Sequence, residues 1–161
     1  MKPARMTATM TIDAPSDAVF AVLADPAAHA AIDGTGWVRE PLDAAQLTET
    51  GQIFRMAMYH DNHPDKDYEM ANRVEVIERP RMIACQPGQE SPETGEHGFG
   101  GWVWRYDLDE SAPSQTTVTL TYDWSAVPEP IRKNIQFPPF AHDHLENSLQ
   151  HLSDLVGQEK T

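Results

Sequence analysis

Histidine and acidic side chains gather in one polar segment, residues 60–67, with the sequence His-Asp-Asn-His-Pro-Asp-Lys-Asp. Imidazole nitrogens and carboxylate oxygens are ligands that zinc and calcium use in proteins. A metal site also needs these groups to converge on one point, and spacing along a sequence does not provide that convergence. We therefore interpret the segment as a solvated loop between two strands, and we expect no metal.

Acid–base chemistry has one candidate group, which is His60 together with Tyr106 or Tyr122. An imidazole or a phenol near an enolisable ketone could move the protons that cyclisation and dehydration require. The group rests on strand alternation alone, which places the three side chains on one predicted face. These residues are therefore weak catalytic candidates.

Two histidines near the C-terminus, His144 and His151, are seven residues apart in a predicted helix. This spacing places them on one helix face, whereas His142 and His144 are two apart and do not share a face. One of the pair could face the interior of the protein, and the alternative is a histidine at the edge of the helix.

Other catalytic signatures are missing from the sequence, which has no Ser-His-Asp order, glycine-rich phosphate loop or paired cysteine motif. Hydride and phosphate transfer are therefore not expected, nor is a cofactor. The one cysteine, Cys85, cannot form an intramolecular disulfide, so we expect a reducing compartment and a cytoplasmic protein. Because no reactive motif lies near Cys85, we also expect its side chain to be a small inert hydrophobe.

The chain of 161 residues suits a single domain, residues 1–161, and it carries a net charge of −13. Nucleic-acid binding depends on basic side chains that displace counterions, so this charge argues against a nucleic-acid partner. The sequence also contains no apolar run long enough to span a membrane and no secretory signal, so membrane insertion is not expected.

Strand and helix patterns follow one another in the order strand, two short helices, about six strands and a long helix. Ser16 or Asp17 is the predicted cap of the first helix. The predicted strands are 7–13, 37–42, 52–60, 68–78, 82–86, 101–109 and 116–124, and the predicted helices are 19–25, 27–32 and 140–156. Residues 87–98, rich in Gly, Pro and Glu, are predicted to form a loop, and Gly157 is predicted to stop the last helix.

Short turns between successive strands favour an antiparallel sheet, and the last helix has one apolar face, so the pattern predicts an α+β fold. Each long strand has one large apolar face that we expect to turn toward this helix. On the strand 68–78 that face includes Val74 and Val76. A close-packed core and a lined ligand cavity fit this pattern equally well.

Several segments resemble members of the START-like (SRPBCC) superfamily, in particular the bacterial branch of polyketide cyclases, dehydrases and lipid-transport proteins. The segments with this resemblance, which follow one another along almost the whole chain, are Ile12-Asp13-Ala14-Pro15, Val19-Phe20, Leu23-Ala24-Asp25-Pro26, His29, Ile32-Asp33-Gly34-Thr35-Gly36, Trp104-Arg105-Tyr106 and Thr121-Tyr122-Asp123-Trp124-Ser125. The resemblance implies a helix-grip fold, in which a curved antiparallel sheet of about seven strands wraps around the C-terminal helix and leaves a cavity.

The expected function is therefore to bind a small hydrophobic or amphipathic molecule, such as a lipid, a polyketide or an aromatic compound. The expected lining residues are Phe54, Met56, Met58, His60, Met70, Asn72, Trp102, Trp104, Tyr106, Tyr122, Trp124 and His144. One alternative is an enzyme of the cyclase/dehydratase type that uses His and Tyr as acid and base. Another is a protein-interaction module, antitoxin- or stress-related, with a filled cavity. The protein could be a monomer or a homodimer.

Overall fold

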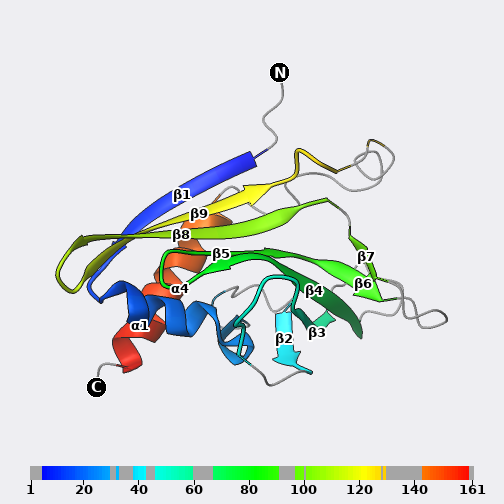
Figure 1. The fold of residues 1–161 in the computed structure, drawn as a ribbon, viewed down its shortest axis with the longest axis horizontal. Coiled ribbons are helices and arrows are strands. Elements are labelled where there is room, and N and C mark those ends of the chain that lie inside the picture. Colours follow the sequence, from blue (N-terminus) through cyan, green and yellow to red (C-terminus); the bar gives the residue numbers. More distant parts are fainter. Residues whose placement is uncertain are drawn as a thin grey trace.

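A strongly curved antiparallel sheet forms the main layer of the protein. The structure is a computed structural model that describes residues 5–29, 32, 38–42, 46–59, 67–90, 97–99, 101–127, 129 and 143–159. Over the described residues, the sheet has seven strands in the order β1-β9-β8-β5-β4-β3-β2, so β1 and β9, far apart in the sequence, are neighbours (Figure 1). These strands are β1 (Arg5–Ile12), β2 (Val38–Pro41), β3 (Ile53–Tyr59), β4 (Asp67–Glu78), β5 (Met82–Gln86), β8 (Val103–Ala112) and β9 (Gln115–Asp123).

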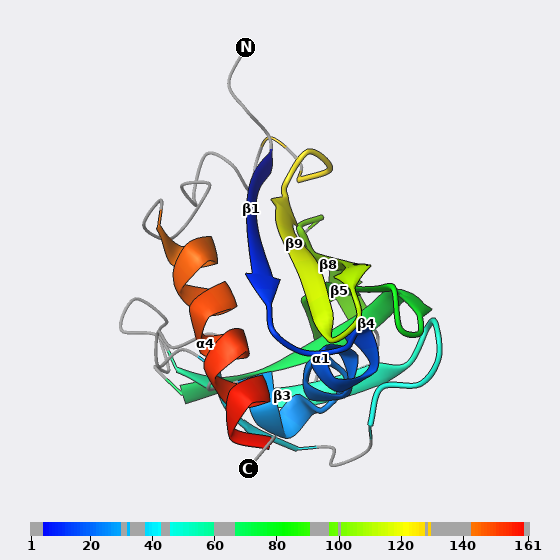
Figure 2. The same ribbon diagram turned by 90° about the vertical axis from the view of Figure 1, so that its left-hand side faces the viewer.

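Two helices lie on one side of this sheet, which we call the concave face. The long helix α4 (His144–Glu159) packs against β1 and β9, and α1 (Ser16–Leu23) packs against α4, β8 and β9. Figure 2 shows α4 beside β1 with the sheet curving beneath both helices. The observed architecture is the predicted helix-grip α+β fold.

Alternating side chains explain the layers, because each strand turns its large apolar residues to the concave face. Val118 and Leu120 of β9 are fully buried there, with Ala8 and Ile12 of β1 beside them. Leu149 and Leu152 close the core from α4. The opposite side of the sheet, which we call the outer face, carries threonines and charged residues.

The start of α1 differs from the prediction. Pro15 occupies the N-cap position, and no side-chain cap is formed by Ser16 or Asp17. Instead, a carboxylate oxygen of Glu110 accepts a hydrogen bond from the Ser16 backbone N–H at 3.2 Å. The hydroxyl of Thr116 donates to the Ala14 carbonyl at 2.8 Å. The β8–β9 hairpin therefore satisfies one of the free N–H groups at the start of α1, as a local cap would, and it also binds the backbone just before the helix.

The ends of other predicted elements also shift. Residues 87–98 are not only a loop, because they include β6 (Gly88–Glu90) and β7 (His97–Phe99), which pair as a second small sheet. Helix α4 continues through Gly157, which lacks the positive φ of a helix-ending glycine. The second predicted helix begins as a 3-10 turn, η1 (Pro26–Ala28), and the described residues His29 and Ile32 that follow it are α-helical.

A bulge changes the predicted face of β4. Its pairing with β5 shifts between Val74 and Val76, so Val74 is buried whereas Val76 is 36% exposed. An extra residue in one strand reverses the side-chain alternation beyond it. Ile77 therefore replaces Val76 on the concave face, opposite Ile83. Within the described part of the chain, no helix is both long enough and apolar enough to cross a membrane.

Candidate functional site

Four aromatic rings form a continuous chain on the concave face, near the start of α4. We call Trp104, Tyr122, Trp124 and His144 the aromatic cluster. The ring centroids of Trp104 and Tyr122 are 4.5 Å apart, and those of Tyr122 and Trp124 are 5.6 Å apart. His144 meets Trp104 edge-to-face at 5.9 Å. These separations are those of favourable ring contacts.

Strand pairing explains why these rings meet. Trp104 of β8 lies directly opposite Tyr122 of β9, and residues opposite each other in an antiparallel pair share a face. Trp124 follows two residues after Tyr122 and has the same orientation. His144 reaches the cluster from the first residue of α4.

The cluster is unevenly covered. Tyr122, Trp124 and His144 are buried, whereas Trp104 is only half-buried. Burial raises the pKa of the Tyr122 phenol well above its ordinary value, so this hydroxyl stays protonated at physiological pH. It can therefore donate a hydrogen bond to a neutral acceptor.

Helix α4 adds a small polar group beside the cluster. Ser148 lies one helical turn after His144 and is 3% exposed. His151 is half-buried and donates a hydrogen bond from Nδ1 to the Ile32 carbonyl at 3.0 Å. The shared helix face is thus confirmed, and it places His144 inside and His151 in contact with the backbone at Ile32.

The other part of the predicted lining lies on β3 and β4. Phe54 pairs with Asn72, and Met56 with Met70, so these four side chains share the concave face. Phe54 and Met56 are buried, whereas Met70 and Asn72 are half-buried. Met58 is also half-buried and packs against the core. The sheet order places β5 and β8 between this group and Tyr122.

His29 packs edge-to-face against the ring of Phe54, with centroids 5.7 Å apart. Its Nε2 donates to the Leu23 carbonyl at 2.9 Å. Burial lowers the pKa of His29, although this hydrogen bond and the charge of Asp25 act in the opposite direction. The imidazole is therefore neutral near pH 7 and ties the end of α1 to β3.

The lining contains very little charge. Among the strand residues on the concave face whose side chains the structure describes, only Glu110 is charged, and its carboxylate binds the start of α1. The polar groups near the cluster are neutral ones, such as the Tyr106 and Tyr122 phenols and the Ser148 hydroxyl. Such a surface favours an uncharged ligand, because a buried charge needs an opposite charge to compensate its lost hydration.

Cys85 lies opposite Trp104, on β5, and is half-buried. Burial, assisted by the charge of Glu75, raises the pKa of the Cys85 thiol to about 12. Since the thiolate is the reactive form, this cysteine is inert at neutral pH, as the sequence predicts.

The predicted residues have three outcomes. Those that the structure places on the concave face are Phe54, Met56, Met58, Met70, Asn72, Tyr106, Trp104, Tyr122, Trp124 and His144. Trp102 is half-buried and packs against the same core. His60, the predicted acid–base residue, lies outside the described residues, together with most of the polar segment 60–67.

Sequence reasoning did not assign Ser148 and His29 to this region, and it did not predict that Cys85 faces the concave side. Ser148 is a small polar residue in an amphipathic helix, and its spacing of four from His144 was the available signal. Over the residues that the structure describes, histidine, cysteine and acidic side chains form no group that could hold a metal ion.

Comparison with known proteins gives one family match and many similar structures. The model of the family "Activator of Hsp90 ATPase homolog 1-like protein" matches residues 13–157. An uncharacterized protein of Mycobacterium tuberculosis (MT0096) is 27% identical over 77% of this chain and 49% of its own length. The chain therefore spans about half the length of this curated relative.

Two solved structures illustrate the shared fold. Protein Ms6760 from Mycobacterium smegmatis has a TM-score of 0.66 and 14% identity, covering 97% of this chain and 92% of its own. A point mutant of norcoclaurine synthase from Thalictrum flavum, in complex with a transition-state analogue, has a TM-score of 0.64 and 13% identity. That comparison covers 98% of this chain and 96% of the synthase. At these identities the likeness concerns the fold alone.

Proposed function

Because the chain belongs to the family of Activator of Hsp90 ATPase homolog 1-like proteins, within the START-like superfamily, we propose that it binds a small hydrophobic molecule between its curved sheet and α4. Among the ligand classes that the sequence suggests, an uncharged aromatic compound, such as an aromatic polyketide, fits the concave face best. A lipid with a charged headgroup fits less well.

The observation that supports this proposal most strongly is the incomplete burial of Trp104 on the concave face. Large aromatic side chains on an inward-facing surface normally lose most of their contact with water. Trp102, Tyr106 and Met70 share this partial exposure. A ligand that covers these side chains would remove apolar surface from water, which is the main source of affinity in such sites.

The chemistry of the surroundings limits the ligand. The Trp104 and Tyr122 rings offer flat apolar surfaces, and planar ligands stack on such rings. The protonated Tyr122 phenol and the His144 imidazole supply the few polar contacts that fix orientation. No described cation on the concave strands would pair with a carboxylate or a phosphate.

Dye binding tests the proposal directly. We expect the uncharged dye N-phenyl-1-naphthylamine to bind with enhanced fluorescence, and the anionic dye anilinonaphthalene sulfonate and oleate to bind more weakly. Replacing Trp104 with Leu should raise the Kd of the uncharged dye by roughly tenfold, because an aromatic contact contributes about 0.5–1.5 kcal/mol beyond its buried area.

Val103→Ala is the matched control for Trp104→Leu. Val103 is the neighbouring residue of the same strand, is also half-buried, and pairs with Asp123 on the outer face. Its replacement should leave the Kd unchanged. Equal weakening by both variants, or tighter binding of oleate than of the uncharged dye, would contradict the proposed site.

Native mass spectrometry of freshly purified protein would identify a natural ligand. A co-purified aromatic molecule, recovered in an organic extract, would support the proposal and name the compound class. A protein that is empty and also fails to bind the uncharged dye would instead favour the interaction-module alternative.

A cyclase- or dehydratase-type activity is the second candidate, and the buried phenol of Tyr122, which lies between the rings of Trp104 and Trp124, favours it. This hydroxyl could stabilise the developing negative charge on a ketone oxygen of a bound ligand. Tyr122→Phe removes the hydroxyl and keeps the ring. If the protein is an enzyme, this variant should bind the recovered ligand normally and lose turnover, whereas equal turnover would reject the role.

A further inference from the structure

The two edges of the seven-stranded sheet are built differently. The β2 edge has four residues, a register shift in its pairing and a proline, Pro41. Short length, irregular pairing and proline all hinder the addition of another strand. The β1 edge has eight residues that pair with β9 in one continuous register without a bulge. It lacks each of the features that protect β2.

Hydrogen bonding leaves one side of β1 available. Among the described residues, the backbone groups of Arg5–Ile12 bond only to β9, apart from the Ile12 carbonyl, which accepts from Ala14. Helix α4 packs on the concave side chains of β1 rather than bonding to its backbone. A strand with unpaired N–H and C=O groups is a template for another strand.

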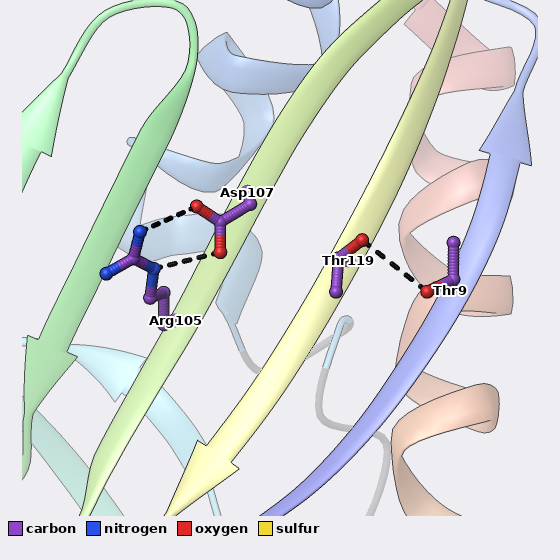
Figure 3. A network of polar contacts seen from close by, with 4 residues as sticks. All are labelled: Thr9, Arg105, Asp107 and Thr119. Atoms are coloured by element: carbon purple, nitrogen blue, oxygen red, sulfur yellow. Dashed lines mark hydrogen bonds and ion pairs between the residues drawn. The ribbon is translucent and has the colours of Figure 1, made fainter.

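The outer face of β1 is neutral, regular and exposed. Thr7, Thr9 and Thr11 follow one another on this face, and all three are exposed. The Thr9 and Thr11 hydroxyls hydrogen-bond to those of Thr119 and Thr117 on β9, at 3.4 and 3.3 Å. Figure 3 shows the Thr9–Thr119 contact at this edge, while the ion pair of Arg105 and Asp107 lies farther in, on β8. No charged side chain lies within β1 beyond Arg5 to repel a strand.

We propose that a second copy of this chain pairs with β1 through its own β1, antiparallel, about a twofold axis at Thr9. Residues opposite each other in an antiparallel pair point to the same face, so each threonine must pair with an outer-face residue of the other copy. In β1 the outer-face residues have odd numbers and the concave-face residues have even numbers, so the two residue numbers of every pair must add up to an even number. With Thr9 on the axis, Thr7 faces Thr11 of the other copy, and Ala8 faces Met10.

Charge complementarity favours a twofold axis at Thr9 over axes at the adjacent residues of β1. Pairs that sum to eighteen place Arg5 opposite Asp13 of the other copy, twice in the dimer. Both residues are exposed, and Asp13 directly follows the last residue of β1. Within one copy, Arg5 also lies opposite Asp123 of β9, and the Asp13 carboxylate accepts a hydrogen bond from Gln115 Nε2 at 3.2 Å. A shift of the axis by one residue in either direction removes both ion pairs. Exposed ion pairs contribute little affinity, so we assign them the choice of register and assign the affinity to the backbone bonds.

Cross-linking through engineered cysteines tests both the partner and the register. In Thr9→Cys, the two new thiols face each other, with Cα atoms about 4.5–5.5 Å apart, inside the range that a disulfide spans. We expect oxidation to give a covalent dimer of twice 18.0 kDa. In the matched variant Thr7→Cys, the two thiols lie roughly 13 Å apart along the strands, so no covalent dimer should form.

Sedimentation equilibrium over a dilution series of the unmodified protein measures the association itself. Thr9→Lys places two ammonium groups opposite each other and should raise the dimer dissociation constant by at least about tenfold. Thr121→Lys, on the same face but on the inner strand β9, should change it little. Both sites are on the outer face, so thermal melting of each variant checks that the fold is kept.

Hydrogen exchange separates the proposed dimer from other coverings of the edge. Protection of β1 amides that increases with protein concentration supports the proposal. A monomer at every concentration, a dimer that Thr9→Cys does not cross-link, or β1 amides that are equally protected in the monomer by another segment would each overturn it.

Discussion

The two ends of the concave face are built from the same strands yet differ in how they are filled. At the hairpin end, α1 covers β8 and β9, and Phe20 and Val118 have no exposed surface. At the aromatic end, near the start of α4, Trp104 and Tyr106 are only half-buried. The sheet therefore supports a finished core at one end and an incompletely covered aromatic surface at the other.

This difference indicates that the hairpin end mainly determines the stability of the fold, whereas the aromatic end mainly determines ligand binding. The hairpin end holds its helix by polar bonds as well, because Glu110 and Thr116 bind the start of α1. A change there should cost folding energy and leave the ligand surface intact. A change at the aromatic end should do the reverse.

Phe20→Ala is the strongest test of this separation. Removal of a fully buried phenylalanine leaves a cavity and should lower the free energy of unfolding by about 3–5 kcal/mol. It also removes the ring beneath the Arg79 guanidinium, which lies 5.1 Å from the centroid. Urea denaturation measures the loss. Trp104→Ala should cost clearly less, because the indole is half-buried, and equal costs would show that both ends are equally well packed.

Gly101→Ala tests the backbone that precedes the aromatic end. Gly101 has a φ of +98°, and an added Cβ would lie 2.6 Å from the Ala126 carbonyl oxygen. We expect a loss of about 1–3 kcal/mol from the backbone conformation, increased by this clash. Gly51→Ala is the matched control, since Gly51 has a φ of +91° and open space around its Cβ position.

The difference between the two glycine variants isolates the clash at Gly101. If it is a local effect, Gly101→Ala should also weaken binding of the uncharged dye, and Gly51→Ala should not. Identical stability and dye binding in the two variants would mean that the contact with Ala126 is unimportant.

His29→Gln tests how the stability of the fold depends on pH. The pKa of His29 is lower in the folded protein, so the unfolded chain binds more protons as the pH falls below about 6.5. Stability from this group is therefore complete above that pH and is lost progressively below it. Gln can donate to the Leu23 carbonyl and does not titrate. We expect a smaller loss of stability between pH 7 and pH 5 in the variant, measured by urea denaturation, and an unchanged slope would exclude His29 as the titrating group.

Strand alternation predicted the sheet and the shared face of the candidate lining residues from the sequence. Strand β5 has the predicted bounds, and β3 and β4 are matched within one residue, apart from His60, which lies outside the described residues. The predicted superfamily is confirmed, while its polyketide-cyclase and lipid-transport branch stays a prediction. The alternation of side chains along β8 and β9 also placed Trp104, Tyr122 and Trp124 on one face of the predicted sheet.

The errors arise where a distant segment replaces a local signal. Glu110, 94 residues away from Ser16 in the chain, replaces the local cap of α1. A bulge opposite β5 turns Val76 outward, and periodicity within β4 contains no sign of it. The exposure of Trp104 depends on how α4 sits over the sheet, so the composition of β8 could not predict it.

The pairing of β1 with β9 also determines when β1 can join the sheet during synthesis of the chain. Thr9 bonds to Thr119, 110 residues later in the chain, and β1 has no other strand partner within the described chain. At a translation rate of 5–20 residues per second, β1 waits roughly 5–20 seconds for its place in the sheet. Strand β1 therefore joins the sheet only after β9 has left the ribosome, and the nascent chain must tolerate an unpaired β1 for that time.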